Sequence, residues 1–107
     1  MLFMVISTPR PERPSELTAD RTRFWPWLAG HEAAGRCKGA WAKAGRGAVV
    51  LLDVASNEEL HAILNQWADI IPAHFEVLPL IDTGAARSFL AGTAAAAPGD
   101  RPDGGRA

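Results

Sequence analysis

Histidines are the side chains of this sequence best suited to transfer protons near neutral pH, because the unperturbed pKa of histidine lies there. His31 shares one helical stripe with Phe24 and Leu28, so we expect it to face a sheet from a helix. His74 begins a segment of strand character and lies on the same face of it as Glu76. His74 could therefore act as a base that the Glu76 carboxylate orients. A core histidine and an exposed strand end are the commoner roles for such residues. Both remain catalytic candidates for proton transfer next to a carbonyl group.

Positive side chains gather on and before a central glycine-rich turn, where they could stabilise an oxyanion or a carboxylate. These residues are Arg36, Lys38, Lys43 and Arg46. Strand alternation places Lys43 on the same face as Trp41, so Lys43 is the catalytic candidate at the mouth of a pocket. A lysine on an edge strand also prevents the addition of another strand, and that role is the more common one.

The stretch RFWPWLAGHE, residues 23–32, places three aromatic side chains around a proline. Trp25 and Trp27 lie roughly 200° apart on an ideal helix, so they cannot both enter the core of one monomer. At least one of them should line a pocket or a subunit interface. Pro26 removes a hydrogen bond from the middle of the predicted helix, and we therefore expect a kink or a break there.

Six predicted elements position these side chains. A capping box formed by Ser56 and Glu59 begins the second helix, and Pro79 indicates that the last strand lies at an edge or contains a late bulge. The predicted ranges are strands over 1–8, 37–44, 48–54 and 74–81 and helices over 16–34 and from 56 to the residues before Pro72. The order β-α-β-β-α-β predicts an α+β, ferredoxin-like fold in which two helices cover one face of a four-stranded antiparallel sheet.

The first strand is apolar on both faces, since Leu2, Met4 and Ile6 alternate with Phe3 and Val5. Packing two sheets together in a homodimer would bury the second face, which predicts a dimeric α+β barrel or a larger ring built from it.

The sequence after the last strand divides into an arm and a tail. In the arm, residues 83–93, Phe89 and Leu90 are isolated apolar side chains that could dock on another subunit. The tail, residues 94–107, is rich in alanine, proline, glycine and charge, which is typical of disorder. We therefore expect one domain over residues 1–93, arm included, followed by a disordered tail.

Composition argues against several kinds of partner. The formal net charge is −1 and the basic residues are scattered, so no nucleic-acid surface is expected. Cys37 is the only cysteine and the three histidines match no standard ligand spacing, so neither a disulfide within the chain nor a metal site is expected. The apolar start MLFMVIS is too short for a membrane span and lacks the features of a signal peptide, which predicts a cytoplasmic protein without a membrane partner.

Several segments, taken in order, resemble the muconolactone isomerase family over about residues 1–82. They are MLFMVIS, the G-x-x-x-x-x-W run from Gly35 to Trp41, the Ala44–Gly45 turn, Asp53–Val54, and SNEELHAILNQ at 56–66. The resemblance implies a ferredoxin-like dimeric barrel and a pocket between sheet and helices. It also implies proton transfer in a small unsaturated lactone without metal or organic cofactor.

Two departures from that family pattern suggest a different substrate. The family carries a histidine early in the first strand and acidic residues in the first helix, where this chain has Met4 and the aromatic stretch from Phe24 to Trp27. The predicted substrate is therefore larger, flatter and more hydrophobic than muconolactone. The candidate substrate-binding side chains are Met4, Phe24, Trp25, Trp27 and Trp41.

The first functional hypothesis is a cofactor-free isomerase, epimerase or cyclase acting by proton transfer on a small aromatic, polyketide-like or lactone substrate. One alternative is a binding or assembly protein of the same fold that lacks catalysis, because the family's histidine and acidic positions are changed. A third hypothesis is a cofactor-free oxygenase of the dimeric-barrel type, which also uses aromatic pockets.

Overall fold

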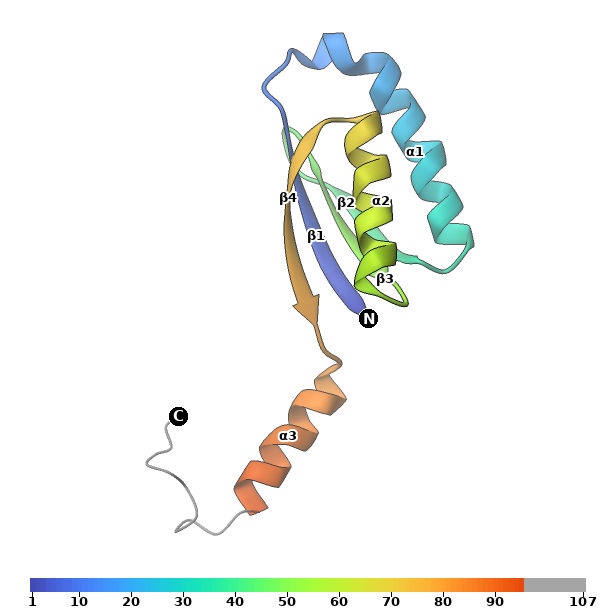
Figure 1. Cartoon of the computed structure of the whole chain (residues 1–107). Coiled ribbons are helices and arrows are strands. Elements are labelled where there is room, and N and C mark those ends of the chain that lie inside the picture. The colour runs from blue at the N-terminus through green and yellow to red at the C-terminus, as the bar shows by residue number, and fades with distance from the viewer. Residues whose placement is uncertain (96–107) are drawn as a thin grey trace.

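Four antiparallel strands form a sheet that carries helices on one of its faces, as Figure 1 shows for the computed structural model. The structure describes residues 1–95. The strands are β1 (Leu2–Pro9), β2 (Cys37–Ala42), β3 (Ala48–Asp53) and β4 (Ala73–Leu80). The helices are the 3-10 turn η1 (Pro14–Leu17), α1 (Thr18–Ala33), α2 (Asn57–Ile70) and α3 (Thr83–Ala95). The strand order is β2-β3-β1-β4, so the α+β, ferredoxin-like prediction is confirmed.

The core lies between the inner face of the sheet and helices α1 and α2. Val5 and Val50 pair across β1 and β3 and are fully buried. Helix α1 contributes Phe24 and Leu28 to this core, and α2 contributes a stripe at helical spacing that ends in Trp67. Burial of each large apolar side chain stabilises the fold by roughly 1.5–3 kcal/mol, which fixes both helices on this face.

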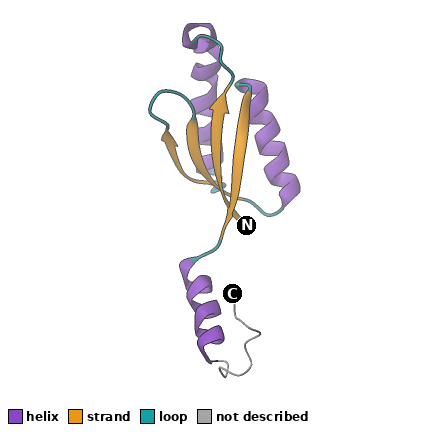
Figure 2. Cartoon of the chain, turned by 90° about the vertical axis from the view of Figure 1, so that its left-hand side faces the viewer, coloured by secondary structure: helices purple, strands orange, loops and turns teal. Residues whose placement is uncertain are grey.

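The outer face of the sheet is also apolar. Within residues 1–95 no helix covers this face, which Figure 2 shows from its own side. Met4 lies between Leu51 and Leu78 across the neighbouring strands, and all three leave part of their surface exposed. Trp41, opposite Val49, is 57% exposed on the same face. The prediction that β1 is apolar on both faces is therefore confirmed.

Helix α1 differs from its prediction at its start and at Pro26. It begins at Thr18, after η1, and it continues through Pro26 to Ala33 without interruption. Of the two outcomes predicted at Pro26, the break was wrong and the kink stays a prediction. An interior proline costs about 3 kcal/mol, whereas burial of Phe24 and Leu28, one on each side of it, stabilises the helical path by a similar or larger amount.

The other elements lie close to their predicted positions. Ser56 caps α2, because its Oγ accepts a hydrogen bond from the Glu59 amide at 3.1 Å, and Glu59 in turn accepts one from the Ala55 amide at 2.7 Å. Strand β4 is an edge strand, as Pro79 indicated.

Helix α3 extends away from the body of the fold (Figure 1), and its Phe89 and Leu90 are 73% and 64% exposed. Of the predicted disordered tail, Ala94 and Ala95 belong to α3. The rest, residues 96–107, lies outside the described residues. Within residues 1–95, no helix is long and apolar enough to cross a membrane.

Candidate functional site

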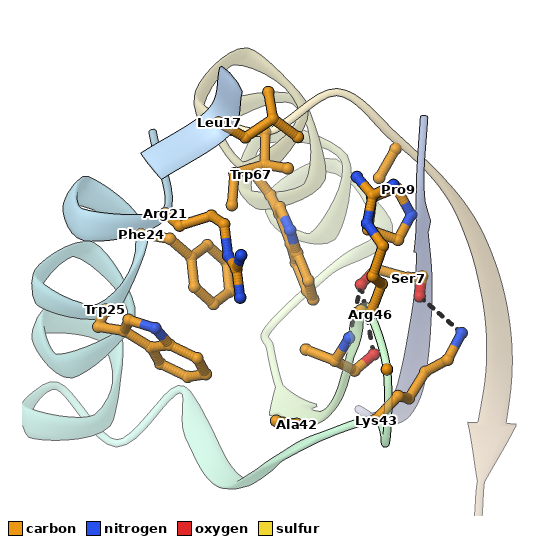
Figure 3. Close-up of a pocket in the computed structure, with 15 residues that line it drawn as sticks. Ser7, Pro9, Leu17, Arg21, Phe24, Trp25, Ala42, Lys43, Arg46 and Trp67 are labelled. Atoms are coloured by element: carbon orange, nitrogen blue, oxygen red, sulfur yellow. Dashed lines mark hydrogen bonds between the residues drawn. The ribbon is translucent and has the colours of Figure 1, made fainter. Parts of the chain in front are cut away.

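A cavity of about 110 Å³ opens between the start of α1, the end of α2 and the β2–β3 hairpin. Figure 3 shows Arg21 and the aromatic side chains on the helical side of the cavity, whereas the Lys43 side chain extends away from the rings to the Ser7 carbonyl. The residues that line it are Ser7, Pro9, Leu17, Arg21, Phe24, Trp25, Ala42, Lys43, Gly45, Arg46, Gly47, Ala48, Trp67, Ile71 and Ala73. Segments distant in the sequence therefore build one site.

Aromatic rings form the wall of the cavity on the helical side. Phe24 lies edge-on to Trp25 with ring centroids 5.0 Å apart, and it contacts Trp67 at 5.1 Å. Trp67 and Phe24 are buried, whereas Trp25 is 50% exposed and borders the opening. Such a wall suits a flat ring, which can stack on one aromatic face while meeting the edge of another.

Two cations come from the hairpin and are fixed by backbone carbonyl groups. Lys43 Nζ donates to the Ser7 carbonyl at 2.9 Å and to Thr8 Oγ1 at 3.4 Å. Arg46 donates from Nη1 to the Glu12 carbonyl at 2.8 Å and from Nη2 to the Arg10 carbonyl at 2.9 Å. These acceptors carry no formal charge, so neither cation is paired with a carboxylate through these bonds.

The sequence GRG lets the hairpin approach β1 this closely. Gly45 and Gly47 have φ angles of +95° and +103°, which side chains rarely allow. A Cβ on Gly47 would lie 2.4 Å from the Ser7 carbonyl oxygen. Ser7 is itself fixed, because its buried Oγ accepts a hydrogen bond from the Ala48 amide at 2.9 Å.

Arg21 is the third cation of the cavity and comes from the first turn of α1. Its guanidinium makes no hydrogen bond or ion pair within residues 1–95, whereas the neighbouring Asp20 pairs with Arg23 at 2.9 Å. Figure 3 shows the Arg21 side chain extending beside Phe24 toward the interior of the cavity. None of the lining residues in this described part of the chain is Asp, Glu or His, so the three positive charges meet no opposing carboxylate there.

Three of the residues predicted from sequence lie at this cavity: Phe24, Trp25 and Lys43. His31 is buried on the inner face of α1 but does not line the cavity. Its Nδ1 accepts a hydrogen bond from Arg36 Nε at 2.8 Å, and its ring meets Trp27 edge-on at 4.8 Å. Burial and then the Arg36 charge lower the pKa of His31 from its ordinary value, so the neutral form is favoured.

The remaining predicted residues lie elsewhere. Trp27 packs between the helices, where its Nε1 donates to Gln66 Oε1 at 3.0 Å. Met4, Trp41 and His74 belong to the outer face of the sheet. The structure therefore separates His31, on the helical side, from His74, on the uncovered side. His74 pairs across the strands with Thr8, whose Oγ1 accepts a hydrogen bond from Lys43 Nζ, so His74 and the lysine candidate lie near one another.

Sequence reasoning missed Arg21 and did not place Trp67 at the cavity. A signal for Arg21 was present, because Arg21, Phe24 and Trp25 have the i, i+3 and i, i+4 spacing that brings side chains together on a helix. For Trp67 the helical stripe indicated burial but could not show which neighbours it would have.

The fold and cavity define a small ferredoxin-like α+β domain with a cationic, aromatic-lined site. The chain belongs to the family described as "Domain of unknown function (DUF3303)", whose model matches residues 1–94. The muconolactone isomerase family is therefore not confirmed as its family. No curated protein matches the chain.

A solved structure with a similar fold is 5-chloro-2-hydroxyhydroquinone dehydrochlorinase (TftG) from Burkholderia phenoliruptrix AC1100, in complex with 2,5-dihydroxybenzoquinone. The match has a TM-score of 0.57 and 18% sequence identity, and it covers 76% of this chain and 94% of that protein. A similarity at this level of identity concerns the fold.

Proposed function

We propose that this protein is a cofactor-free enzyme of the isomerase type, which promotes proton transfer in a small, flat ring compound bearing a carbonyl group. The observation that carries the proposal is that two fixed cations, Lys43 and Arg46, belong to the lining of a cavity whose helical side is a wall of aromatic rings. The resemblance to muconolactone isomerases supports the same reaction type. The fold neighbour, in complex with a small ring quinone, supports the class of ligand.

The cations would act by stabilising an enolate. As the C–H bond next to the carbonyl breaks, its proton passes to water and its electron pair moves onto the carbonyl oxygen. Protonation at another ring position completes the tautomerisation. Lys43 uses two of its three N–H donors within the protein and Arg46 two of its five, so both retain donors for that oxygen.

Fixed donors are effective because they need no reorganisation when charge develops. Removal of one donor from such a site commonly slows the reaction about 10²- to 10³-fold. Lys43 is the better residue to test, because Arg46 also holds the carbonyl groups of the β1–η1 loop.

A non-catalytic binding protein is the second candidate, and one observation favours it. No carboxylate or imidazole lines the cavity within the described residues, so this chain supplies no side chain that ordinarily serves as a general base there. Binding of a ring compound without acceleration of proton transfer would support this function.

The test uses 2,5-dihydroxybenzoquinone as the probe. Quenching of tryptophan fluorescence measures binding, because Trp25 and Trp67 line the cavity. Exchange of the ring hydrogens with deuterium in D₂O, followed by proton NMR, measures proton transfer, because each exchange requires deuteration of a ring carbon to give the keto tautomer and then loss of the original proton from that carbon. We expect the wild type to bind the probe and to accelerate exchange, and Lys43→Met to reduce the acceleration about 10²-fold.

Lys38→Met is the matched control, because Lys38 lies on β2 outside the cavity lining. It should exchange the probe like the wild type. Unchanged acceleration in Lys43→Met would overturn the role of Lys43, binding without acceleration would support the non-catalytic function, and no binding would refute both.

We also propose a homodimer in which the outer sheet faces of two chains pack together. The apolar side chains exposed on that face, Trp41 and Leu78 among them, support this arrangement. Docking of Phe89 and Leu90 on a second subunit and a cytoplasmic location stay predictions.

A further inference from the structure

We infer that the ring compound bound by this cavity carries a carboxylate group and that Arg21 binds it. The inference rests on the proposed function and adds to it the charge of the substrate and the residue that selects it. Lys43 and Arg46 would then act on the reacting oxygen, while Arg21 would recognise a separate group at the opening.

The charge of the cavity is the first support. Three cationic side chains line it, and no acidic side chain does so within residues 1–95. Lys43 and Arg46 are bonded to uncharged oxygen atoms, so their positive charge is not neutralised. A neutral compound would leave all three charges without a counterion, whereas an anion would be attracted to the opening and retained there.

The state of Arg21 is the second support. Lys43 and Arg46 are held by hydrogen bonds to the backbone, but no donor of the Arg21 guanidinium is used within the described part of the chain. The nearest acidic neighbour on α1, Asp20, is already paired with Arg23. Because the guanidinium presents a planar fork of N–H groups, its best small partner is a carboxylate that accepts two parallel hydrogen bonds.

The position of Arg21 is the third support. Arg21 and Trp25 line the cavity and also border a shallow hollow with Thr18 and Thr22 on the outer side of α1. Arg21 therefore lies at the boundary between cavity and solvent, where an entering anion meets it first. Its side chain extends beside Phe24 in Figure 3, so a carboxylate bound there would place an attached ring near the aromatic wall.

The size of the cavity limits the substrate to a compact molecule. An apolar cavity of roughly 150 Å³ holds one benzene molecule, and the cavity here, about 110 Å³ with an opening at Arg21 and Trp25, suits a single ring whose substituents reach the opening. The substrate class is therefore a monocyclic unsaturated or aromatic carboxylate with a carbonyl or enol oxygen on the ring. This compact, charged molecule differs from the larger and more hydrophobic substrate that the sequence predicted.

A matched pair of probes tests this inference: 2,5-dihydroxybenzoate and 2,5-dihydroxybenzamide, which differ in charge and little in shape. Binding is measured by tryptophan fluorescence and calorimetry for the wild type, Arg21→Gln, Arg21→Lys and Lys38→Gln. We expect the wild type to bind the carboxylate at least about tenfold more tightly than the amide, as for one hydrogen-bonded ion pair. Lys38→Gln, the control that removes a positive charge on β2 outside the cavity lining, should keep that preference.

Arg21→Gln should remove the preference by weakening the carboxylate alone, and Arg21→Lys should restore part of it, because a lysine keeps the charge but not the planar fork. Arg21 is exposed and has no side-chain partner within residues 1–95, so the variants should fold, which circular dichroism checks.

A preference that survives in Arg21→Gln would overturn the role of Arg21. Equal binding of both probes by the wild type would overturn the substrate class while leaving the proposed function intact. If the wild type bound neither probe nor 2,5-dihydroxybenzoquinone, the proposed function and this inference would both fail.

Discussion

Replacing Gly47 by alanine should destabilise the fold and displace Lys43 from the cavity. Gly47 lies in the β2–β3 hairpin with a φ angle of +103°, and an added Cβ would lie 2.4 Å from the Ser7 carbonyl oxygen. That oxygen also accepts the hydrogen bond from Lys43 Nζ, and the Lys43 side chain would lie 3.3 Å from the new methyl group. Relief of the overlap therefore requires movement of the hairpin away from β1.

The magnitude has two parts. The unfavourable φ angle costs about 1–3 kcal/mol for a residue with a side chain. Crowding of a well-packed site adds about 1–3 kcal/mol, and here the neighbour is a backbone atom that cannot rotate away. We expect a loss of roughly 2–6 kcal/mol, a large share of the approximately 5–15 kcal/mol by which a domain is stable.

Gly45→Ala is the matched control, because Gly45 has a φ angle of +95° and an added Cβ would meet nothing within 4 Å. Urea unfolding followed by tryptophan fluorescence should show Gly47→Ala to be less stable than Gly45→Ala by about 1–3 kcal/mol. Equal destabilisation by the two substitutions would contradict the close approach of the hairpin to β1. In the exchange assay with 2,5-dihydroxybenzoquinone, Gly47→Ala should also lose more activity than Gly45→Ala.

Two further predictions concern pH and assembly. The pKa of His31 is lowered from 6.5 in the fold. The part of the free energy of unfolding that depends on His31 should therefore be highest above pH 6.5 and fall as the pH is lowered through the folded-state pKa. Urea titrations should show the stability of His31→Gln to be less pH-dependent than that of the wild type, and an equal dependence would contradict this. Leu51→Lys adds a charge to the outer sheet face and should shift the sedimentation equilibrium toward monomer, whereas Ala62→Lys, on the exposed side of α2, should leave it unchanged. A wild type that sediments as a monomer, or a Leu51→Lys dimer as stable as the wild type, would refute the proposed interface.

Much of the fold could be predicted from the sequence because its signals are local. Ser56 and Glu59 begin α2 by hydrogen bonds within one turn, and the alternation in β1 identifies a strand that is apolar on both faces. Pro26 shows where local reasoning fails. The cost of an interior proline is real, but the burial of Phe24 and Leu28 depends on tertiary contacts that a local signal does not contain.

The candidate site was predicted only in part, and His31 shows why. Helical periodicity correctly indicated that His31 faces inward with Phe24. However, His31 lies seven positions after Phe24, which is roughly 10 Å farther along the helix axis. The cavity lies at the Phe24 end of the helix. The period specifies the direction of a side chain around the helix axis, but it does not specify which part of the sheet or hairpin lies opposite.

The sequence by itself determined the order of the elements, the apolar faces of the strands, and the glycine-rich hairpin that carries Lys43 and Arg46. Only the tertiary structure decided which charges share a cavity. Arg21, Lys43 and Trp67 come from α1, the hairpin and α2, and their proximity depends on how these elements pack across the sheet. Backbone propensities act over a few residues, whereas a site assembled from distant segments is set by the packing of the core and by hydrogen bonds such as that from Lys43 to Ser7.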